Sequence, residues 1–444
     1  MDLDPWLPRA AALRPDHPAV IDADSTITTY AEMHAQALDA AAVLQAKGIE
    51  RGDRVALAMP AGVPFLAAFH AALMLGAAVV PIDLRLGPGE RDQRTTGARA
   101  VVSEPLRRAG EPDAETLDRL DADTPATLVH TSGTTAAPKP IALTVGNWTW
   151  NALASALALG LEPEDRWLCM LPLSHVGGLA ILIRSAIYGS TVILHERFET
   201  EAALTAIERD RATLVSLVPT TLERLLDAGL KAPNPLRVAL IGGGPLPPVL
   251  AAQAQEAGIP VAQTYGMTEA CSQVATSLPG EPETAGRPLV GTQVDIADDG
   301  EILVSGPTVA PDARDPDDGW LHTGDLGTLD AQGRLVVTGR KADTIVSGGE
   351  NVAPAEVEAA LLAHPAVADA GVYGRPDPQW GEAVVATVVL HDGSQAEAEE
   401  LRAHVASQLA RYKVPKEISF AAQLPRNASG KLLRRELRQD PATR

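Results

Sequence analysis

The chain alternates short apolar runs with longer stretches rich in alanine and leucine. The short runs have the length of buried strands, and the stretches between them have the length of helices. Strand, helix, strand in this rhythm predicts an α/β fold with mostly parallel sheets flanked by helices. The predicted strands are Arg54–Met59, Ala78–Ile82, Thr191–Leu194, Thr213–Val218 and Leu236–Ile241, and the predicted helices are Tyr30–Lys47, Val63–Leu75 and Glu201–Arg209.

The pattern changes from Thr292 onward, where shorter strands are separated by turns. These strands, Val294–Ala297, Glu301–Val304 and Arg334–Thr338, predict a small β-rich section late in a large N-terminal domain. By contrast, the segment 87–123 is polar and poor in β-branched residues, which indicates that most of it lies at the surface.

A compact α+β pattern follows Arg340. It predicts a large domain at residues 1–340 and a small C-terminal domain at 341–444, the latter with strands near Ala370 and Val384. Ser394 precedes its second helix and is a suitable N-cap. The two helices predicted here are Pro354–Ala363 and Gln395–Leu409.

The longest apolar stretch, 65–82, is long enough to suggest a membrane span. Gly76 divides it into an Ala/Leu-rich helix and a short β-branched strand, and it lacks aromatic or basic anchors. We therefore interpret it as buried core, and the N-terminus shows no signal-peptide pattern. Two cysteines are too few for a disulfide framework and favour reduced thiols in a cytoplasmic protein.

Charge restricts the partners of this chain. The formal net charge is −20, from 37 basic and 57 acidic residues. Such a protein repels nucleic acid and anionic membranes at long range, so we expect neither as a partner. An anionic small-molecule substrate therefore needs local cations and backbone amides to hold it.

The first chemically informative stretch is a loop of hydroxyls, a glycine and a lysine after the strand-like run 126–130. Gly133 lets backbone amides face an anion, and the hydroxyls and Lys139 add donors and charge, as in a phosphate site. The spacing is not that of a Walker A loop, and such a loop is often only a turn. The loop comprises Thr131, Ser132, Gly133, Thr134, Thr135, Ala136, Ala137, Pro138 and Lys139.

Three glycines and a proline, Gly242, Gly243, Gly244 and Pro245, follow the strand-like run 238–241 directly. Glycines at the C-terminal end of a parallel strand let a flat ligand approach the backbone, where α/β sheets bind nucleotides. A tight turn is the alternative reading of the same residues.

Three further stretches carry polar groups suited to a nucleotide. In the first, Tyr265 can stack on a base, Thr268 can donate to a phosphate, and Glu269 can hold Mg²⁺, which prefers carboxylate and phosphate oxygens. Asp325 supplies a carboxylate for ribose hydroxyls, and Arg340 offers a fork for ribose or phosphate. Lys431 lies on a glycine-flanked loop near the C-terminus.

In this order, these stretches resemble the adenylate-forming superfamily, which contains acyl- and aryl-CoA synthetases, luciferases and peptide-synthetase adenylation domains. The resemblance runs from Thr28 to Lys431. It implies a mobile C-terminal domain and an enzyme that uses ATP and Mg²⁺ to form an acyl-adenylate, then transfers the acyl group to a thiol such as that of coenzyme A. It also makes a homodimer plausible.

The resemblance implies a role for each motif. The 131–139 loop covers the pyrophosphate, the glycines and Tyr265 frame adenine, Glu269 binds Mg²⁺, and Asp325 and Arg340 hold the ribose. Lys431, Thr134 and His175 take part in catalysis. Gly266 and Thr268 complete the nucleotide site, and Gly243, Gly266, Met267 and His175 line the acid pocket.

The family rotates its small domain between the two half-reactions. Lys431 then leaves, and the loop containing Gly348 and Gly349 enters, where the missing Cβ atoms let a pantetheine arm pass. The hinge position, often acidic or lysine in relatives, is Ala342 here. Trp380 resembles a coenzyme A contact, with a packed surface tryptophan as the alternative, and Arg85 is a weaker candidate for a coenzyme A phosphate.

Several stretches are similar to o-succinylbenzoate–CoA ligases of menaquinone biosynthesis, namely 171–179, 240–245, 265–273 and 347–358. Arg184 gives an independent argument, because a guanidinium inside the apolar run 179–187 is costly unless paired. The second carboxylate of o-succinylbenzoate needs a cation, and Arg184 fits that need. The alternatives are pairing with a protein carboxylate or reaching solvent.

Three other readings remain open. The chain resembles enzymes that ligate other aryl or acyl acids to coenzyme A, stand-alone enzymes that load a carrier protein, and, if catalytic motifs were lost, a nucleotide-binding protein. Cys271 is expected to be a pocket-wall or core residue rather than a nucleophile. Arg434 and Arg435, after Lys431, are interpreted as a solvated helix face.

Overall fold

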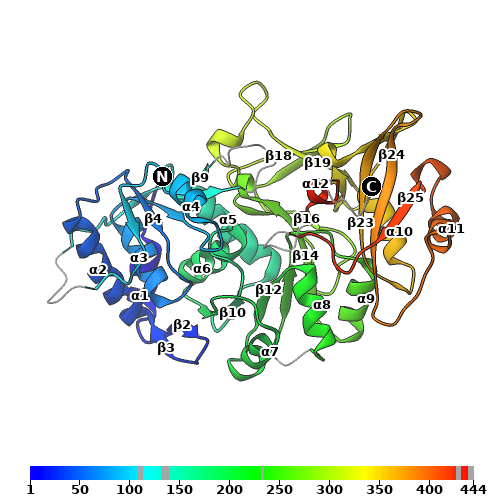
Figure 1. Ribbon diagram of the computed structural model, residues 1–444. Helices are drawn as coiled ribbons and strands as arrows, with labels where there is room; N and C mark the ends of the chain where they lie inside the picture. The colour runs from blue at the N-terminus through cyan, green and yellow to red at the C-terminus, as the bar shows by residue number, and fades with distance from the viewer. Residues whose placement is uncertain (108–113, 132–139, 232–234, 427–431, 439–444) are drawn as a thin grey trace.

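The computed structural model describes residues 1–107, 114–131, 140–231, 235–426 and 432–438. Figure 1 shows a large part built from the N-terminal and central segments, with the C-terminal sheet and its helices beside it. The predicted α/β class, with a large N-terminal region and a small C-terminal α+β unit, is confirmed by this arrangement.

A nine-stranded sheet forms the centre of the large part. Six of its strands run parallel, and antiparallel strands close both edges. In spatial order the strands are β16 (Arg287–Pro288), β15 (Ser272–Thr276), β14 (Val261–Met267), β13 (Val238–Ile241), β12 (Leu214–Leu217), β10 (Arg166–Cys169), β11 (Thr191–Leu194), β2 (Pro18–Asp22) and β3 (Ile27–Thr29).

A second, five-stranded sheet lies in the N-terminal part, and all but its last strand pair in parallel. Its order is β6 (Ala100–Val102), β4 (Arg54–Leu57), β5 (Ala78–Pro81), β8 (Pro125–His130) and β9 (Pro140–Thr144), and the short pair β1 (Asp2–Leu3) and β7 (Leu120–Asp121) stands apart. Strand β5 is buried along its whole length, which explains its continuous apolar sequence.

Helices cover these sheets and share one large core with them. Helix α2 begins with a capping box, in which Thr29 and Glu32 satisfy each other's backbone amides. The helices of the large part are α1 (Trp6–Leu13), α2 (Tyr30–Ala46), α3 (Val63–Met74), α4 (Pro88–Arg94), α5 (Val145–Leu159), α6 (Val176–Tyr188), α7 (Thr200–Arg209), α8 (Pro219–Asp227) and α9 (Pro248–Glu256).

The long apolar stretch divides at Gly76, as predicted, into helix α3 and strand β5. Gly76 has φ +74°, which ends the helix, and a Cβ there would lie 2.9 Å from a Leu117 methyl group. Among the residues that the structure describes, no helix is long and apolar enough to cross a membrane.

The β-rich section is a four-stranded antiparallel sheet of β17 (Gln293–Ile296), β18 (Glu301–Ser305), β19 (Leu321–Leu329) and β20 (Leu335–Arg340). A separate sheet follows, with a core of its own. Its elements are β21 (Ile345–Ser347), β22 (Glu350–Val352), α10 (Pro354–Leu362), β23 (Val367–Asp377), β24 (Gly381–Leu390), α11 (Ala398–Gln408), β25 (Glu417–Phe420) and α12 (Arg434–Leu437). The change of sheet after β20 agrees with a boundary near Arg340, which stays a prediction.

The predicted N-cap of the second small-domain helix is wrong. Helix α11 begins at Ala398, and Glu397 is its N-cap, paired with Glu400 in a capping box. Ser394 instead donates its backbone N–H to the carbonyl of His391 in the preceding turn. Ser394 therefore belongs to a turn that lies four residues before the start of the helix.

Candidate active site

The glycines after β13 lie next to the strand that carries Tyr265. Strands β13 and β14 are parallel neighbours, with Ile241 opposite Gln263. A Cβ at Gly242 would lie 3.0 Å from a methyl carbon of Thr264, and Gly243 has φ +80°, a conformation that favours glycine. Both positions therefore favour glycine over a residue with a side chain, and nucleotide binding at this edge of the sheet stays a prediction.

Strand β14 bends at Gly266, where its pairing with β15 shifts register. A Cβ at Gly266 would lie 1.7 Å from the carbonyl oxygen of Ser272, so the hairpin itself demands glycine here. Cys271 is fully buried with φ +54°, and burial raises the pKa of its thiol well above the usual value. A buried neutral thiol agrees with the prediction that Cys271 is not a nucleophile.

Tyr265, Asp325 and Arg340 are brought together from three strands. The Tyr265 hydroxyl donates to one carboxylate oxygen of Asp325 at 2.9 Å, and Arg340 Nε lies 2.7 Å from the other. Asp325 and Arg340 are opposite each other on β19 and β20. Burial, followed by the Asp325 charge, raises the pKa of Tyr265, which keeps the phenol protonated as a donor.

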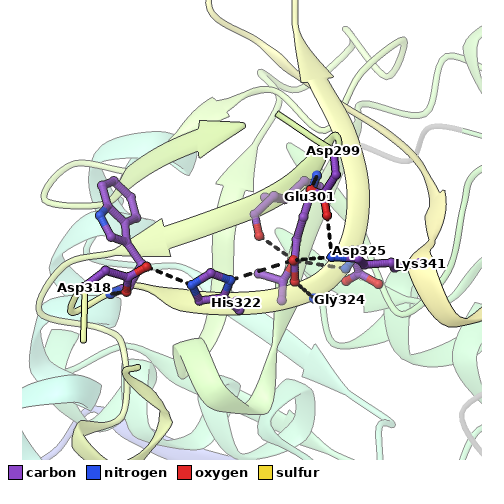
Figure 2. A network of polar contacts seen from close by, with 10 residues as sticks. Asp299, Glu301, Asp318, His322, Gly324, Asp325 and Lys341 are labelled. Carbon is purple, nitrogen blue, oxygen red and sulfur yellow. Dashed lines mark hydrogen bonds and ion pairs between the residues drawn. The ribbon is translucent and has the colours of Figure 1, made fainter. Parts of the chain in front are cut away.

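A lysine and two carboxylates lie beside this group (Figure 2). No motif in the sequence pointed to these three residues. Lys341, in a short 3-10 turn (η3, Lys341–Asp343), contacts Asp299 at 2.5 Å and Glu301 at 3.1 Å. Glu301 is buried and also accepts from the backbone N–H of Gly324 at 2.8 Å. The residue after Arg340 is thereby tied to the strand that bears Asp325.

His322 extends this network to the surface (Figure 2). Its Nε2 lies 2.9 Å from a carboxylate oxygen of Asp318, and its Nδ1 lies 3.7 Å from Glu301. The hydrogen bond to Asp318 is the main reason that the pKa of His322 is raised. When protonated, the imidazole places a second cation beside the buried carboxylate of Glu301.

Glu269 lies on the 3-10 turn η1 (Thr268–Ala270) directly after β14. Among the described residues, no cation lies within 4 Å of its carboxylate, and no group of three or more His, Cys, Asp or Glu side chains forms a metal cage. Mg²⁺ characteristically binds one or two carboxylates together with substrate phosphates rather than a cage. A single partly exposed carboxylate at this strand end fits that mode.

His175 is the N-cap of α6 and is half-buried. Burial lowers the pKa of its imidazole; the nearby Asp83 acts in the opposite direction, and Arg85 and Arg94 lower the pKa further. The neutral imidazole is therefore favoured near pH 7. Arg85 itself forms an ion pair with Asp83 at 2.6 Å.

Arg184 lies on the same helix as His175 but has different neighbours. It is 2% exposed, donates through Nε and one terminal nitrogen to the amide oxygen of Asn151 at 3.2 and 2.6 Å, and lies 5.5 Å from the ring centroid of Trp167. Burial lowers the pKa of its guanidinium, with small opposing effects from Tyr188 and Cys271.

A buried arginine is ordinarily explained by a protein carboxylate beside it or by a side chain that reaches solvent, and the described residues show neither for Arg184. Within the described part of the chain no carboxylate lies within 4 Å of Arg184, and its side chain does not reach solvent. The amide nitrogen of Asn151 is also buried without a hydrogen-bond partner. A desolvated cation whose neutral partner, Asn151, has a buried amide nitrogen left without a hydrogen-bond partner matches a seat for an anionic ligand.

The glycine loop of the small domain has left-handed backbone, with φ +64° at Gly348 and +84° at Gly349. A Cβ at Gly348 would lie 3.1 Å from the ring of Trp380. Trp380 is 37% exposed, and the Lys416 ammonium lies 4.7 Å from its ring centroid. A half-exposed indole with a cation on its face leaves its role in thiol binding a prediction.

Six predicted residues lie outside the described residues: Ser132, Gly133, Thr134, Thr135, Lys139 and Lys431. Thr131 is described and directly follows β8. The remaining nucleotide-site predictions, Pro245, Met267 and Thr268, fall on the same strand ends as Gly242 and Tyr265.

The prediction that Arg434 belongs to a solvated helix face is wrong. Its guanidinium donates to both carboxylate oxygens of Glu358 at 2.7 Å, to Asp343 at 3.1 Å and to the carbonyl of Val372 at 3.1 Å. The side chain is only 18% exposed. Arg434 therefore fixes the segment that follows Lys431 against α10, and it also contacts Asp343 next to the expected hinge.

The fold and this site define a two-part nucleotide-binding enzyme of the α/β class. The chain matches the AMP-binding enzyme family over residues 7–312 and the AMP-binding enzyme C-terminal domain over 356–431. The chain belongs to the AMP-binding enzyme family, and the resemblance to adenylate-forming enzymes is confirmed.

Named relatives are similar over their whole length. The chain is 40% identical to the 2-succinylbenzoate–CoA ligase of Bacillus licheniformis, over 98% of this chain and 100% of that protein. The structure superposes on o-succinylbenzoate coenzyme A synthetase from Bacillus subtilis, in complex with its acyl-adenylate intermediate, with a TM-score of 0.91 and 38% identity over 98% of each chain. The superposition on the complex of that enzyme with ATP and magnesium also gives a TM-score of 0.91, and it covers 99% of this chain and 100% of that chain.

Proposed function

We propose that this chain is a 2-succinylbenzoate–CoA ligase. It takes o-succinylbenzoate, MgATP and coenzyme A to o-succinylbenzoyl-CoA, AMP and pyrophosphate. Full-length relatives of that name at 40% identity support this function, as does the structural match to an enzyme bound to the corresponding acyl-adenylate. ATP and coenzyme A are cytoplasmic substrates, so we also propose the cytoplasm as the compartment of action.

The environment of Arg184 is the structural observation that supports o-succinylbenzoate as the acid. Its buried guanidinium has Asn151 as a neutral partner and no carboxylate in the described residues. o-Succinylbenzoate has two carboxylates, one to be activated and one to be bound. The benzoate carboxylate supplies the countercharge, and the free amide nitrogen of Asn151 offers it a second donor. A plain fatty acid brings no such group.

In the first half-reaction a succinyl carboxylate oxygen attacks the α-phosphorus of ATP, and the bond to pyrophosphate breaks. Asp325, oriented by Tyr265 and Arg340, holds the ribose hydroxyls. Glu269 would supply one ligand to Mg²⁺, which would neutralise phosphate charge, and Lys431 would oppose the charge that builds up around phosphorus. Positioning accounts for most of the remaining rate.

In the second half-reaction the coenzyme A sulfur attacks the acyl carbonyl carbon, and AMP leaves with the electron pair of the broken C–O bond. The thiol proton passes to solvent. Gly348 and Gly349 line the path of the pantetheine arm, Trp380 flanks it, and neutral His175 borders the acyl pocket. Arg85, which pairs with Asp83 at 2.6 Å, would contact a phosphate of coenzyme A.

Thioester products identify the acid directly. Purified protein is incubated with MgATP, coenzyme A and either o-succinylbenzoate, benzoate or a medium-chain fatty acid, and thioesters are measured by mass spectrometry. A strong signal from o-succinylbenzoate alone is expected. A thioester only from another acid contradicts the proposed substrate. AMP release without a thioester indicates a carrier-protein acceptor, and no turnover contradicts the ligase function for these acids.

A further inference from the structure

We infer that the exposed face of helix α5 is the interface between two copies of this chain. Four large apolar side chains lie on this face: Trp150 is 40% exposed, Leu153 49%, Leu157 69% and Leu161 45%. The opposite face of α5, including Asn147, Trp148 and Asn151, is buried in the protein. The inference does not depend on which acid the enzyme uses.

The spacing of these residues is that of a helix-packing seam. Trp150, Leu153 and Leu157 are separated by three and four residues, and Leu161 follows four residues later, just beyond the helix end. Apolar residues at alternating three- and four-residue intervals form the stripe along which two helices pack side by side. An isolated helix that faced water would carry polar residues at these positions.

The apolar face continues onto a neighbouring loop. Gly291 lies against Trp150, because a Cβ at Gly291 would be 3.7 Å from the indole ring, and the adjacent Val290 is 58% exposed. From their exposed fractions, these five side chains together expose on the order of 500 Å² of mostly apolar surface. A specific dimer buries about 800 Å² on each partner, roughly 65% of it apolar. The patch therefore has about the area of the apolar part of one half of a dimer interface.

The distribution of charge favours a second copy of this chain as the partner that covers the patch. The chain carries a net charge of −20, so two copies repel each other, yet α5 contains no charged residue over all of Val145–Leu159. In a twofold dimer each patch meets itself, so a charged patch would face its own sign, and a neutral apolar patch does not. A membrane fits poorly, since α5 also lacks the lysines and arginines that attract anionic lipids.

An antiparallel arrangement places Leu153 of one copy against Leu157 of the other. The helix dipoles then oppose each other favourably, and Trp150 lies across from Leu161 of the second copy. Each interface residue occurs twice in such a contact, so a single substitution acts twice.

Sedimentation equilibrium on the full chain tests this interface. The unaltered protein is expected to be dimeric at micromolar concentration, and Leu157→Glu is expected to raise the dissociation constant at least about a hundredfold. Leu13→Glu is the matched control, because Leu13 on α1 is 64% exposed but lies outside the patch. This control is expected to remain dimeric.

Mixing two variants tests the antiparallel register. Leu153→Glu and Leu157→Lys are each expected to be monomeric alone, and to form a heterodimer when mixed, because the new charges then meet. If a glutamate variant does not fold, the double substitution Leu153→Ala with Leu157→Ala replaces it, with a weaker dimer expected.

Three results overturn the interface: a monomeric unaltered protein at high micromolar concentration, a Leu157→Glu variant as dimeric as the unaltered chain, or a monomer that binds phosphatidylglycerol vesicles through Leu157. Thioester formation, measured in the same samples, reports separately on the proposed reaction.

Discussion

The guanidinium of Arg184 donates two hydrogen bonds to a single atom, the amide oxygen of Asn151, at 3.2 and 2.6 Å. Asn151 is neutral, so the positive charge of Arg184 stays uncompensated between α5 and α6 in the described part of the protein. Leaving a charge in that state is costly for folding, and the cost is recovered when an anionic group binds.

Arg184→Met is therefore expected to separate activity from stability. The kcat/KM for o-succinylbenzoate should fall on the order of a hundredfold to a thousandfold, because the buried charge pair between Arg184 and the substrate is lost. The free energy of unfolding should stay equal or rise by about 1–4 kcal/mol, because an unpaired buried charge is removed. Steady-state kinetics and urea denaturation measure the two effects, with benzoate as a control acid that should lose little.

Asn151→Asp is the complementary change. It places a carboxylate of the protein beside Arg184, so the free energy of unfolding should increase while o-succinylbenzoate binding falls by a similar factor. If Arg184→Met instead unfolds the protein or slows o-succinylbenzoate and benzoate equally, Arg184 is a structural residue and does not select the acid.

Asp325 and Tyr265 are expected to differ in their effects on ATP. Tyr265→Phe removes one hydrogen bond to Asp325, worth about 1 kcal/mol, and should raise the KM for ATP roughly fivefold. Asp325→Asn removes the charge that faces Arg340 and should cost more, on the order of a hundredfold in kcat/KM for ATP. Pyrophosphate exchange measures both, with the exposed Tyr412→Phe as a control. Equal losses would mean that the phenol, and not the carboxylate, is the main contact.

The strands and helices of the large part were predictable because most of their determinants are local. A buried parallel strand such as β11 is a continuous apolar run, and its predicted bounds, Thr191–Leu194, are those observed. The burial of Arg184 was also predictable, since the surrounding residues are apolar in sequence. The prediction for Ser394 was wrong because a local capping signal does not show which of several nearby polar residues becomes part of the turn before the helix. Ser394 is part of that turn, through its backbone hydrogen bond to His391.

The polar networks around the site could not be predicted in the same way. Lys341 meets Glu301 only because β18, β19 and β20 pair in a particular register, and a bulge shifts that register between Glu301 and Leu303. Arg434 meets Glu358 across 76 residues of sequence. Such contacts depend on tertiary pairing, which leaves no periodic signal in the chain.

His70 gives the protein a specific sensitivity to acid. It is fully enclosed on α3, and burial, with a smaller effect from His34, lowers its pKa to about 3. The unfolded chain binds a proton at His70 near pH 6.5, whereas the folded protein does not until about pH 3. Stability is therefore lost as pH falls from 6.5 towards 3.

His70→Leu should remove this contribution. Between pH 7 and pH 5 the unaltered protein is expected to lose about 2 kcal/mol through His70 alone, and the variant should lose that much less. Urea denaturation at the two pH values measures the difference, with the exposed His391→Leu as a control. The same loss in the variant as in the unaltered protein would place the acid sensitivity in other groups.

Lys431 and Gly348 are expected to divide the two half-reactions between them. Lys431→Ala should lower adenylate formation from o-succinylbenzoate and ATP by about a hundredfold to a thousandfold, because the cation opposing the phosphate charge is lost. Transfer from a supplied adenylate to coenzyme A should change little. Gly348→Ala should do the reverse, since its φ of +64° and the Trp380 ring 3.1 Å from the new Cβ both oppose a side chain on the thiol path.

Rapid-quench experiments that measure the acyl-adenylate and the thioester, with each half-reaction followed separately, check the predictions for these two variants. Because one variant impairs the first step and the other the second, each serves as the folding control for its counterpart. An equal loss of both half-reactions in Lys431→Ala would contradict the division, and would mean that the lysine supports the small domain in both orientations instead of acting in adenylation alone.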